Sequence, residues 1–348
     1  MFQRLTRLMA AAFFLASVAG CSWVRDNLDG CLKGFRVQFT VDGVAPIPTK
    51  GAQSVTDLIY EVNDVSLFVF DSEGTYVGRF GEDGDVLKQN GYAIDVPVGP
   101  GRYKVVAWTG ADKENYELSS LREGVSGIKD LELLVSRDEN NRQDNYLHPV
   151  WHGIRTDIEV LPGRYPSYSV ELKKINKNFV LVLQDMKGNS IKGDTFTYEI
   201  QSANGRMGYD ASLLRDDVIN YGAYLVESED LSSDAATGVE NPQVTYSVAR
   251  AELNTTRLHE NNRTRLVVRE RATGTLVLDI DLIRYILLTR ERYEGAVGRK
   301  LTDQEYLDAE DSFSLMFVMM PTGSIVNPYA LVEFRINGWV VRLQDAIL

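Results

Sequence analysis

The stretch FRVQFTV, residues 35–41, decides the fold class of this chain. Its apolar residues alternate with polar ones, which is the period-two pattern of a strand buried on one face. Similar short runs follow at 65–71, 75–80, 92–96, 102–108, 130–135, 157–161 and 168–172. Turn residues separate them at intervals of about 8–12 residues, a spacing typical of a β-sandwich rather than of alternating strands and helices.

The strand pattern pauses at ELKKINKN, residues 171–178, a polar and basic break, and then begins again. The second series comprises runs at 179–185, 196–202, 244–249, 264–270, 274–280, 313–320, 329–336 and 339–343. We therefore predict a mainly β chain of two tandem β-sandwich domains, at residues 34–172 and 173–348.

Two short helices are expected within the second domain. DLIRYILLTRERYEG, residues 281–295, has an apolar face and Asp281 as its N-cap. LTDQEYLDAED, residues 301–311, begins with a capping box of Thr302 and Glu305. The polar segments 136–145 and 226–242 are predicted to be long loops, either recognition loops or solvated insertions.

The N-terminus indicates export and lipidation. Arg4 and Arg7 precede an apolar run too short to span a membrane, as in a secretory signal peptide over residues 1–20. The signal ends in Val18-Ala19-Gly20-Cys21, which resembles a bacterial lipobox. That resemblance implies cleavage between Gly20 and Cys21 and a covalent lipid on the Cys21 thiol. Residues 21–33 then read as a lipidated tether. The alternative is an ordinary signal peptide with a fortuitous cysteine.

The charge of the mature chain excludes one class of partner. Removing residues 1–20 leaves a mature chain of 328 residues. This chain keeps 35 of the 37 basic residues and all 49 acidic ones, so its net charge is −14. Such a surface repels nucleic acid and anionic headgroups, so membrane attachment must come from the lipid. Ser22 follows the lipid cysteine, and by family-level analogy this favours the outer membrane. With Cys21 alkylated, Cys31 has no cysteine partner in the chain.

Residue types that support catalysis are scarce. His148 and His152 have an H-x₃-H spacing, but Pro149 and Gly153 argue against the helix that a zinc site would need. Acidic turns such as 81–86 lack the EF-hand spacing. Five aromatic residues could form a sugar-stacking platform or pack in the core, namely Trp108, Trp151, Trp339, Tyr165 and Tyr168. Core packing is the better interpretation, because each lies on or beside a predicted strand. We predict no enzyme, no metal, no small-molecule substrate and no cofactor besides the covalent lipid.

Several motifs in their observed order resemble the fimbrium anchoring-subunit lipoproteins of Bacteroidales. These are the lipid cysteine followed by CLKGFRVQFTVD (31–42), LHPVWHG (147–153), the segment 282–319, and INGWVVRLQD (336–345). The resemblance implies two transthyretin-like β-sandwiches. It also implies an outer-membrane lipoprotein, part of a fimbrium, that holds a shaft subunit to the cell surface and limits fimbrial length. Alternatives are an accessory or tip subunit, an adhesin, or a surface glycan-binding lipoprotein.

Fimbriae of this kind assemble by strand exchange, in which one subunit completes another subunit's sheet. A subunit added last need only donate, so we expect residues 35–41 to stay in their own sheet. The candidate donor is 339–348, a partner strand that begins at Trp339 and would insert the side chains of Val341, Leu343 and Ile347. The alternative is that 339–343 pairs with 329–336 through the turn at Asn337-Gly338.

Overall fold

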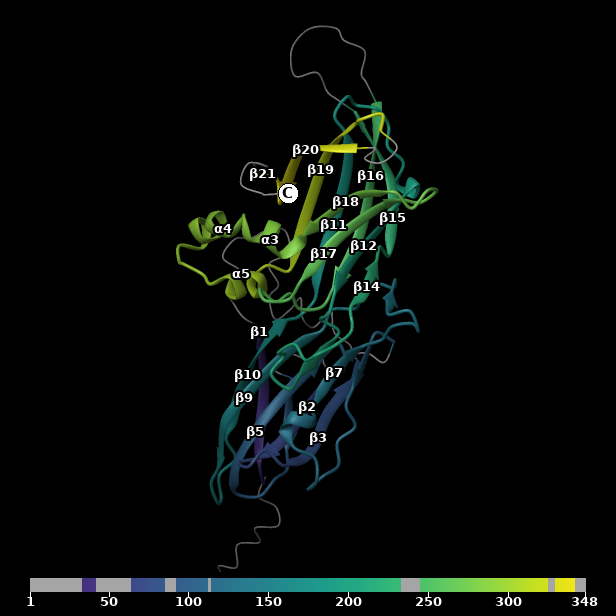
Figure 1. Ribbon diagram of the computed structural model, residues 1–348. Helices are drawn as coiled ribbons and strands as arrows, with labels where there is room; N and C mark the ends of the chain where they lie inside the picture. Colours follow the sequence, from purple (N-terminus) through teal and green to yellow (C-terminus); the bar gives the residue numbers. More distant parts are fainter. Residues whose placement is uncertain are drawn as a thin grey trace, which may run out of the picture.

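The computed structural model describes residues 33–41, 64–84, 92–111, 114–232, 245–324 and 329–341. Two β-rich halves lie end to end, and three short α-helices gather at one side of the second half (Figure 1). The prediction of a mainly β fold with tandem β domains is confirmed.

The first half is built on one seven-stranded sheet in the order β3-β2-β5-β9-β10-β1-β4. Its strands are β1 (Phe35–Val41), β2 (Asp64–Asp71), β3 (Tyr76–Asp83), β4 (Ala93–Val96), β5 (Gly101–Thr109), β9 (Trp151–Val160) and β10 (Ser167–Lys174). β9 and β10 pair only through Lys173↔His152 and Lys174↔Trp151, so the sheet turns there into two facing layers. Apolar side chains from both layers fill the space between them.

A third layer contacts the other face of β2 and β5. The strands β6 (Tyr116–Leu118), β7 (Glu132–Val135) and β13 (Arg206–Gly208) form this small sheet in the order β13-β7-β6. Leu67 and Val69 belong to the first core, whereas Phe68 and Phe70 belong to the cluster shared with β6 and β7. Residues 65–70 of β2 are consequently all buried.

The second half is a sandwich of two sheets. One sheet has the order β15-β16-β11-β19-β20-β21, with β15 (Leu225–Ser232), β16 (Thr245–Thr255), β11 (Lys177–Asp185), β19 (Ser312–Pro321), β20 (Tyr329–Ile336) and β21 (Trp339–Val341). The other has the order β18-β17-β12-β14-β8, with β18 (Leu276–Asp281), β17 (Thr264–Glu270), β12 (Phe196–Ser202), β14 (Ile219–Gly222) and β8 (Arg142–Gln143).

The three helices are α3 (Leu282–Leu287), α4 (Arg290–Val297) and α5 (Asp303–Ala309). Both predicted caps are confirmed: Asp281 accepts from the Arg284 amide, and Thr302 and Glu305 form a capping box. The expected single helix over 281–295 is instead divided into α3 and α4. The Thr289 hydroxyl contacts the Ile286 carbonyl and the Tyr306 hydroxyl, each at 2.8 Å, which fixes the chain where it turns.

The prediction of a loop over 226–242 is wrong for its first part, because β15 extends to Ser232. β15 is an edge strand, and two of its three charged side chains have partners on β16. Glu227 accepts from Arg250 at 3.1 Å, and Asp230 accepts from the Ser247 hydroxyl at 2.5 Å. Residues 233–242 lie outside the described chain. The predicted loop over 136–145 also contains the short strand β8.

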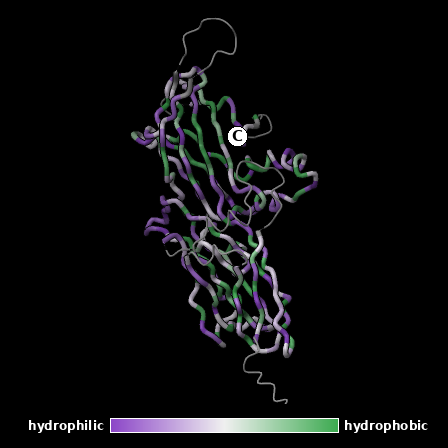
Figure 2. The backbone as a smooth tube through the Cα atoms, turned by 180° about the vertical axis from the view of Figure 1, so that it is seen from behind, coloured by the Kyte–Doolittle hydropathy of each residue, from purple (hydrophilic) through white to green (hydrophobic). Residues whose placement is uncertain are grey.

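The predicted break at 171–178 is present but shorter than expected, because only residues 175 and 176 separate the two strands. β10 runs to Lys174, β11 starts at Lys177, and Ile175, Asn176 and Lys177 are all buried. Two short strands also cross between the halves: β8 pairs with β14, and β13 pairs with β7. One apolar cluster therefore continues from the first half into the second, and apolar segments run along the strands of both (Figure 2). The domain limits 34–172 and 173–348 stay a prediction.

Candidate functional site: a C-terminal sheet edge and a buried clamp

The lipid-attachment residues Gly20 and Cys21 lie outside the described chain, so cleavage and lipidation there stay predictions. In the part of the chain that the structure describes, no helix has the length and apolar character needed to cross a membrane.

The C-terminal hairpin forms one edge of the six-stranded sheet, opposite β15. β20 and β21 pair through Ile336↔Trp339, Arg335↔Val340 and Phe334↔Val341. The turn residues Asn337 and Gly338 have φ values of 49° and 78°, as a two-residue hairpin turn requires. The predicted hairpin alternative is thus confirmed for 339–341. Leu343 and Ile347 lie outside the described residues, and the donor role of Trp339 and Val341 stays a prediction.

Aromatic packing holds this hairpin on the sandwich. Phe334 of β20 is fully buried and stacks on Phe317 of β19, with ring centroids 4.4 Å apart. Tyr285 of α3 meets the same Phe334 ring edge-on at 5.3 Å. The Asn337 side chain accepts from the Ser314 amide at 2.8 Å, which ties the turn to β19. β21 is therefore a fixed strand at the end of a sheet, a position that allows another strand to be added.

The first strand occupies its own sheet, as expected. β1 lies between β10, to which it is parallel, and β4, to which it is antiparallel. Phe35 and Val37 are fully buried between the layers. The first sandwich thus keeps its N-terminal strand.

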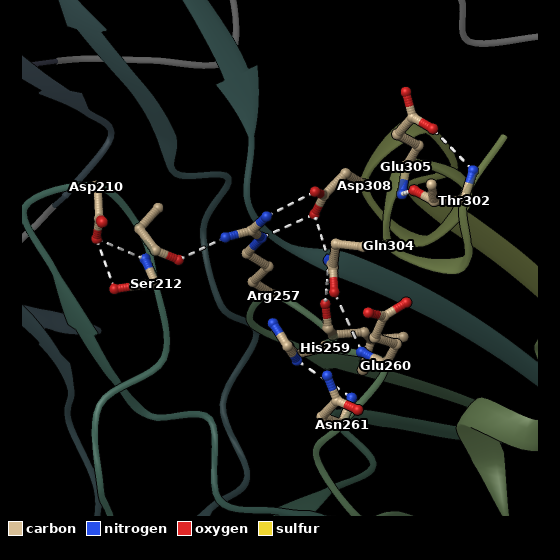
Figure 3. Close-up of polar contacts among 12 residues, drawn as sticks. Asp210, Ser212, Arg257, His259, Glu260, Asn261, Thr302, Gln304, Glu305 and Asp308 are labelled. Carbon is tan, nitrogen blue, oxygen red and sulfur yellow. Dashed lines mark hydrogen bonds and ion pairs between the residues drawn. The ribbon is translucent and has the colours of Figure 1, made fainter.

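A network of polar contacts fastens α5 to the loops beside it (Figure 3). Arg257 donates two hydrogen bonds to Asp308 of α5, at 2.8 and 2.6 Å, and one to the Ala211 carbonyl at 2.8 Å. Gln304 donates to the Leu258 carbonyl at 3.1 Å and accepts from the Glu260 amide at 3.1 Å. Burial acts to raise the pKa of Asp308, but the Arg257 guanidinium outweighs it and holds that pKa below its usual range.

A fully buried lysine reaches the C-terminal end of the same helix. Lys177 Nζ donates to the carbonyl oxygens of Asp308 at 3.1 Å and Glu310 at 2.7 Å, the end at which a helix favours a cation. Burial lowers the pKa of Lys177 to about 8 and raises the pKa of Glu310 to about 7. Lys177, Arg257, Gln304 and Asp308 are called the α5 clamp below.

The residues considered for chemistry lie apart or in the core. Trp108 and Trp151 are 0% and 3% exposed, which confirms core packing for these two residues. Tyr165 and Tyr168 are half-buried, and the Trp339 side chain lies outside the described part of the structure. His152 is buried, with Nε2 donating to the Tyr209 carbonyl at 2.8 Å, and burial lowers its pKa to about 4. His148 is exposed. The described residues contain no group of three or more metal-ligating side chains.

Sequence reasoning missed the α5 clamp and the junction residue Asn176. The side chain of Asn176 accepts from the Val150 amide at 2.6 Å and donates to the Tyr116 hydroxyl at 2.6 Å and the His148 carbonyl at 3.2 Å. The only local sign of this junction in the sequence is the polar run 171–178. Lys177 and Asp308 are 131 residues apart, so no local pattern could pair them.

Solved structures share this architecture. A candidate polysaccharide-binding protein of Bacteroides thetaiotaomicron is 28% identical, with a TM-score of 0.73 over 89% of this chain and 98% of that one. A candidate adhesin of the same species is 25% identical, with a TM-score of 0.73 over 90% and 98%. The fimbrial anchor protein Mfa2 of Porphyromonas gingivalis, 18% identical, shares the fold at a TM-score of 0.64 over 89% and 99%. No curated protein sequence matches the chain.

This fold is that of fimbrial anchor and adhesin proteins, which are structural rather than enzymatic. The family model that matches residues 28–345 is that of the fimbrillin-A associated anchor proteins Mfa1 and Mfa2. The chain belongs to this family, which confirms the predicted family and associates the protein with a fimbrium at the cell surface.

Proposed function

We propose that this protein anchors a fimbrium to the outer membrane through a lipid on Cys21, and that it limits fimbrial length. The observation that carries the proposal is the match to the anchor-protein family over residues 28–345. The position of Cys21 supports it, because the cysteine precedes β1 by a tether short enough to keep the first sandwich near the membrane. One acyl chain gives only reversible membrane binding, so stable anchoring needs more than one.

The shaft subunit binds, in this proposal, through the C-terminal edge of the six-stranded sheet. β21 is the outermost strand, and Val340 on it is 44% exposed. An edge strand offers backbone donors and acceptors to an added strand, and alternating side chains set its register. β1 fills its own place in the first sheet, so we assign shaft binding to the other half of the protein.

Replacing the lipid cysteine tests the anchoring role. We expect cells with Cys21→Ala to release fimbriae into the medium, whereas cells with the matched control Cys31→Ala keep them. Fimbriae are counted on cells and in the medium, with the amount of the anchor protein measured in both strains. Fimbriae that remain on Cys21→Ala cells would contradict the anchor role.

Two truncations test the binding edge. Deletion of 339–348 removes β21, whereas deletion of 342–348 keeps the hairpin that holds the edge of the sandwich. We expect deletion of 339–348 to reduce the retention of fimbriae on cells and deletion of 342–348 to leave it unchanged, with circular dichroism confirming the fold of each variant. Unchanged retention after deletion of 339–348 would exclude this edge as the shaft site.

A glycan-binding adhesin is the second candidate, because the 28% identical neighbour is described as a candidate polysaccharide-binding protein. The buried Trp108 and Trp151 do not serve it. Tyr146 is 41% exposed and meets Tyr224 and His148 edge-on, at 5.0 and 5.5 Å. A glycan array that reports binding by the wild type and its loss in Tyr146→Ala would favour this function, and an array without binding would remove it.

A further inference from the structure

Two long parallel pairings follow one another along the described chain. β1 pairs with β10 over six residue pairs, from Arg36↔Ser167 to Val41↔Leu172. β10 passes into β11 through residues 175 and 176 alone. β11 then pairs with β19 over eight residue pairs, from Asn178↔Ser312 to Asp185↔Met319. The chain thus runs from one half to the other as a nearly continuous extended segment (Figure 1).

The parallel direction decides how such a pairing responds to tension. When one strand is pulled at its beginning and its parallel neighbour at its end, the force lies along the strands. The evenly spaced hydrogen bonds are then strained together, in shear. When two neighbours are pulled apart at the same end, the bonds break one after another, and each needs little force.

The joint between the two pairings is buried and bonded on both sides. Asn176 connects to the segment before β9, where the Val150 amide donates to it at 2.6 Å. Lys177 holds the carbonyl oxygens of Asp308 and Glu310, directly before β19. The Asn178 amide donates to the Asp311 carbonyl at 2.8 Å. The end of the first pairing and the start of the second are therefore both fixed in place.

We propose that β1–β10, the joint at 175–178 and β11–β19 form a load path that carries tension from the N-terminal end of β1 to the far end of β19. This function rests on the proposed anchoring role: tension enters from the lipid at Cys21, which precedes β1, and leaves through the second half toward the shaft. Each parallel pairing in the path is loaded in shear, so the protein holds under a pull in this direction and yields readily to other directions.

Single-molecule pulling on the full chain tests the load path. The background carries Cys21→Ser and Cys31→Ser, so that introduced cysteines are the handles. One variant has Lys33→Cys and Met320→Cys, which loads both parallel pairings in shear. The control has Lys33→Cys and Arg164→Cys, two exposed positions at the same end of β1 and β10, which peels those strands apart.

We expect the mean rupture force to be severalfold higher for the Lys33–Met320 handles than for the Lys33–Arg164 handles at the same loading rate. An equal or lower force with the Lys33–Met320 handles would overturn the proposal. Circular dichroism of both variants before pulling verifies that they are folded. The force ratio does not depend on lipidation, so an unexpected ratio would contradict the load path alone. Fimbriae that remain on Cys21→Ala cells would instead contradict the anchoring role.

Discussion

Replacing Asn176 by leucine should weaken the junction between the two halves. The side chain is 1% exposed, and its loss leaves the buried Val150 amide without its acceptor. An unsatisfied buried donor costs about 1–3 kcal/mol, and each of the two lost donated bonds about 1 kcal/mol. The new apolar side chain recovers about 1–2 kcal/mol. We expect Asn176→Leu to lower the free energy of unfolding by about 2–3 kcal/mol.

Urea unfolding followed by tryptophan fluorescence measures this change, because Trp151 directly follows the segment that Asn176 holds. The matched control is Asn254→Leu, an equally buried asparagine with one bond, to the Leu147 carbonyl at 3.2 Å. We expect the control to lose about 1 kcal/mol or less. A loss in Asn176→Leu no larger than that of the control would refute the reasoning.

Three further changes have defined outcomes. Burial raises the pKa of Glu310 from 4.5 to about 7. The folded state therefore keeps the full stability of the protonated carboxyl below pH 4.5, and it loses that stability as the pH rises through 7 and the carboxyl ionises. Glu310→Gln should therefore be more stable than wild type by about 3 kcal/mol above pH 7, and equal to it below pH 4.5, in urea titrations across pH. Gly338→Ala should lower the free energy of unfolding by about 1 kcal/mol, because φ at this position is 78°, a left-handed conformation that disfavours alanine. No atom lies within 4 Å of the added Cβ, so a steric clash adds nothing to this cost. Unchanged stability would contradict the left-handed conformation of the hairpin turn. Phe313→Ala should cost about 3–5 kcal/mol in calorimetry, because the ring is fully buried and stacks on Phe179 at 5.4 Å. A loss below about 1 kcal/mol would mean that the site collapses around the smaller side chain.

Strands with one buried face could be predicted from the sequence, since their side chains alternate. The runs 35–41, 196–202 and 264–270 match β1, β12 and β17 residue for residue. β15 could not be found this way. Its sequence LVESEDLS is acidic, and its strand conformation depends on partners in β16 that only the folded sheet supplies. β6, β8 and β13 have two or three residues, too few to show a period.

The candidate site was predictable where the signal is local. The turn at Asn337-Gly338 and the caps at Asp281 and Thr302 follow from neighbouring residues. The α5 clamp depends on contacts between distant segments, and in the sequence Lys177 looks like one more surface lysine. A buried lysine is rare unless it is paired, so composition argues against its true position.

The burial of β2 on both faces has a consequence for how the family varies. A protein at the cell surface meets antibodies, and sequence change there is tolerated where a side chain leaves the packing undisturbed. Residues 65–70 offer no such position and no epitope in the folded state. We expect lineages that diverge under immune pressure to keep this strand nearly constant, while substitutions accumulate on strands with an open face. The segment VSLFVF would then be a more durable marker of the family than any surface loop.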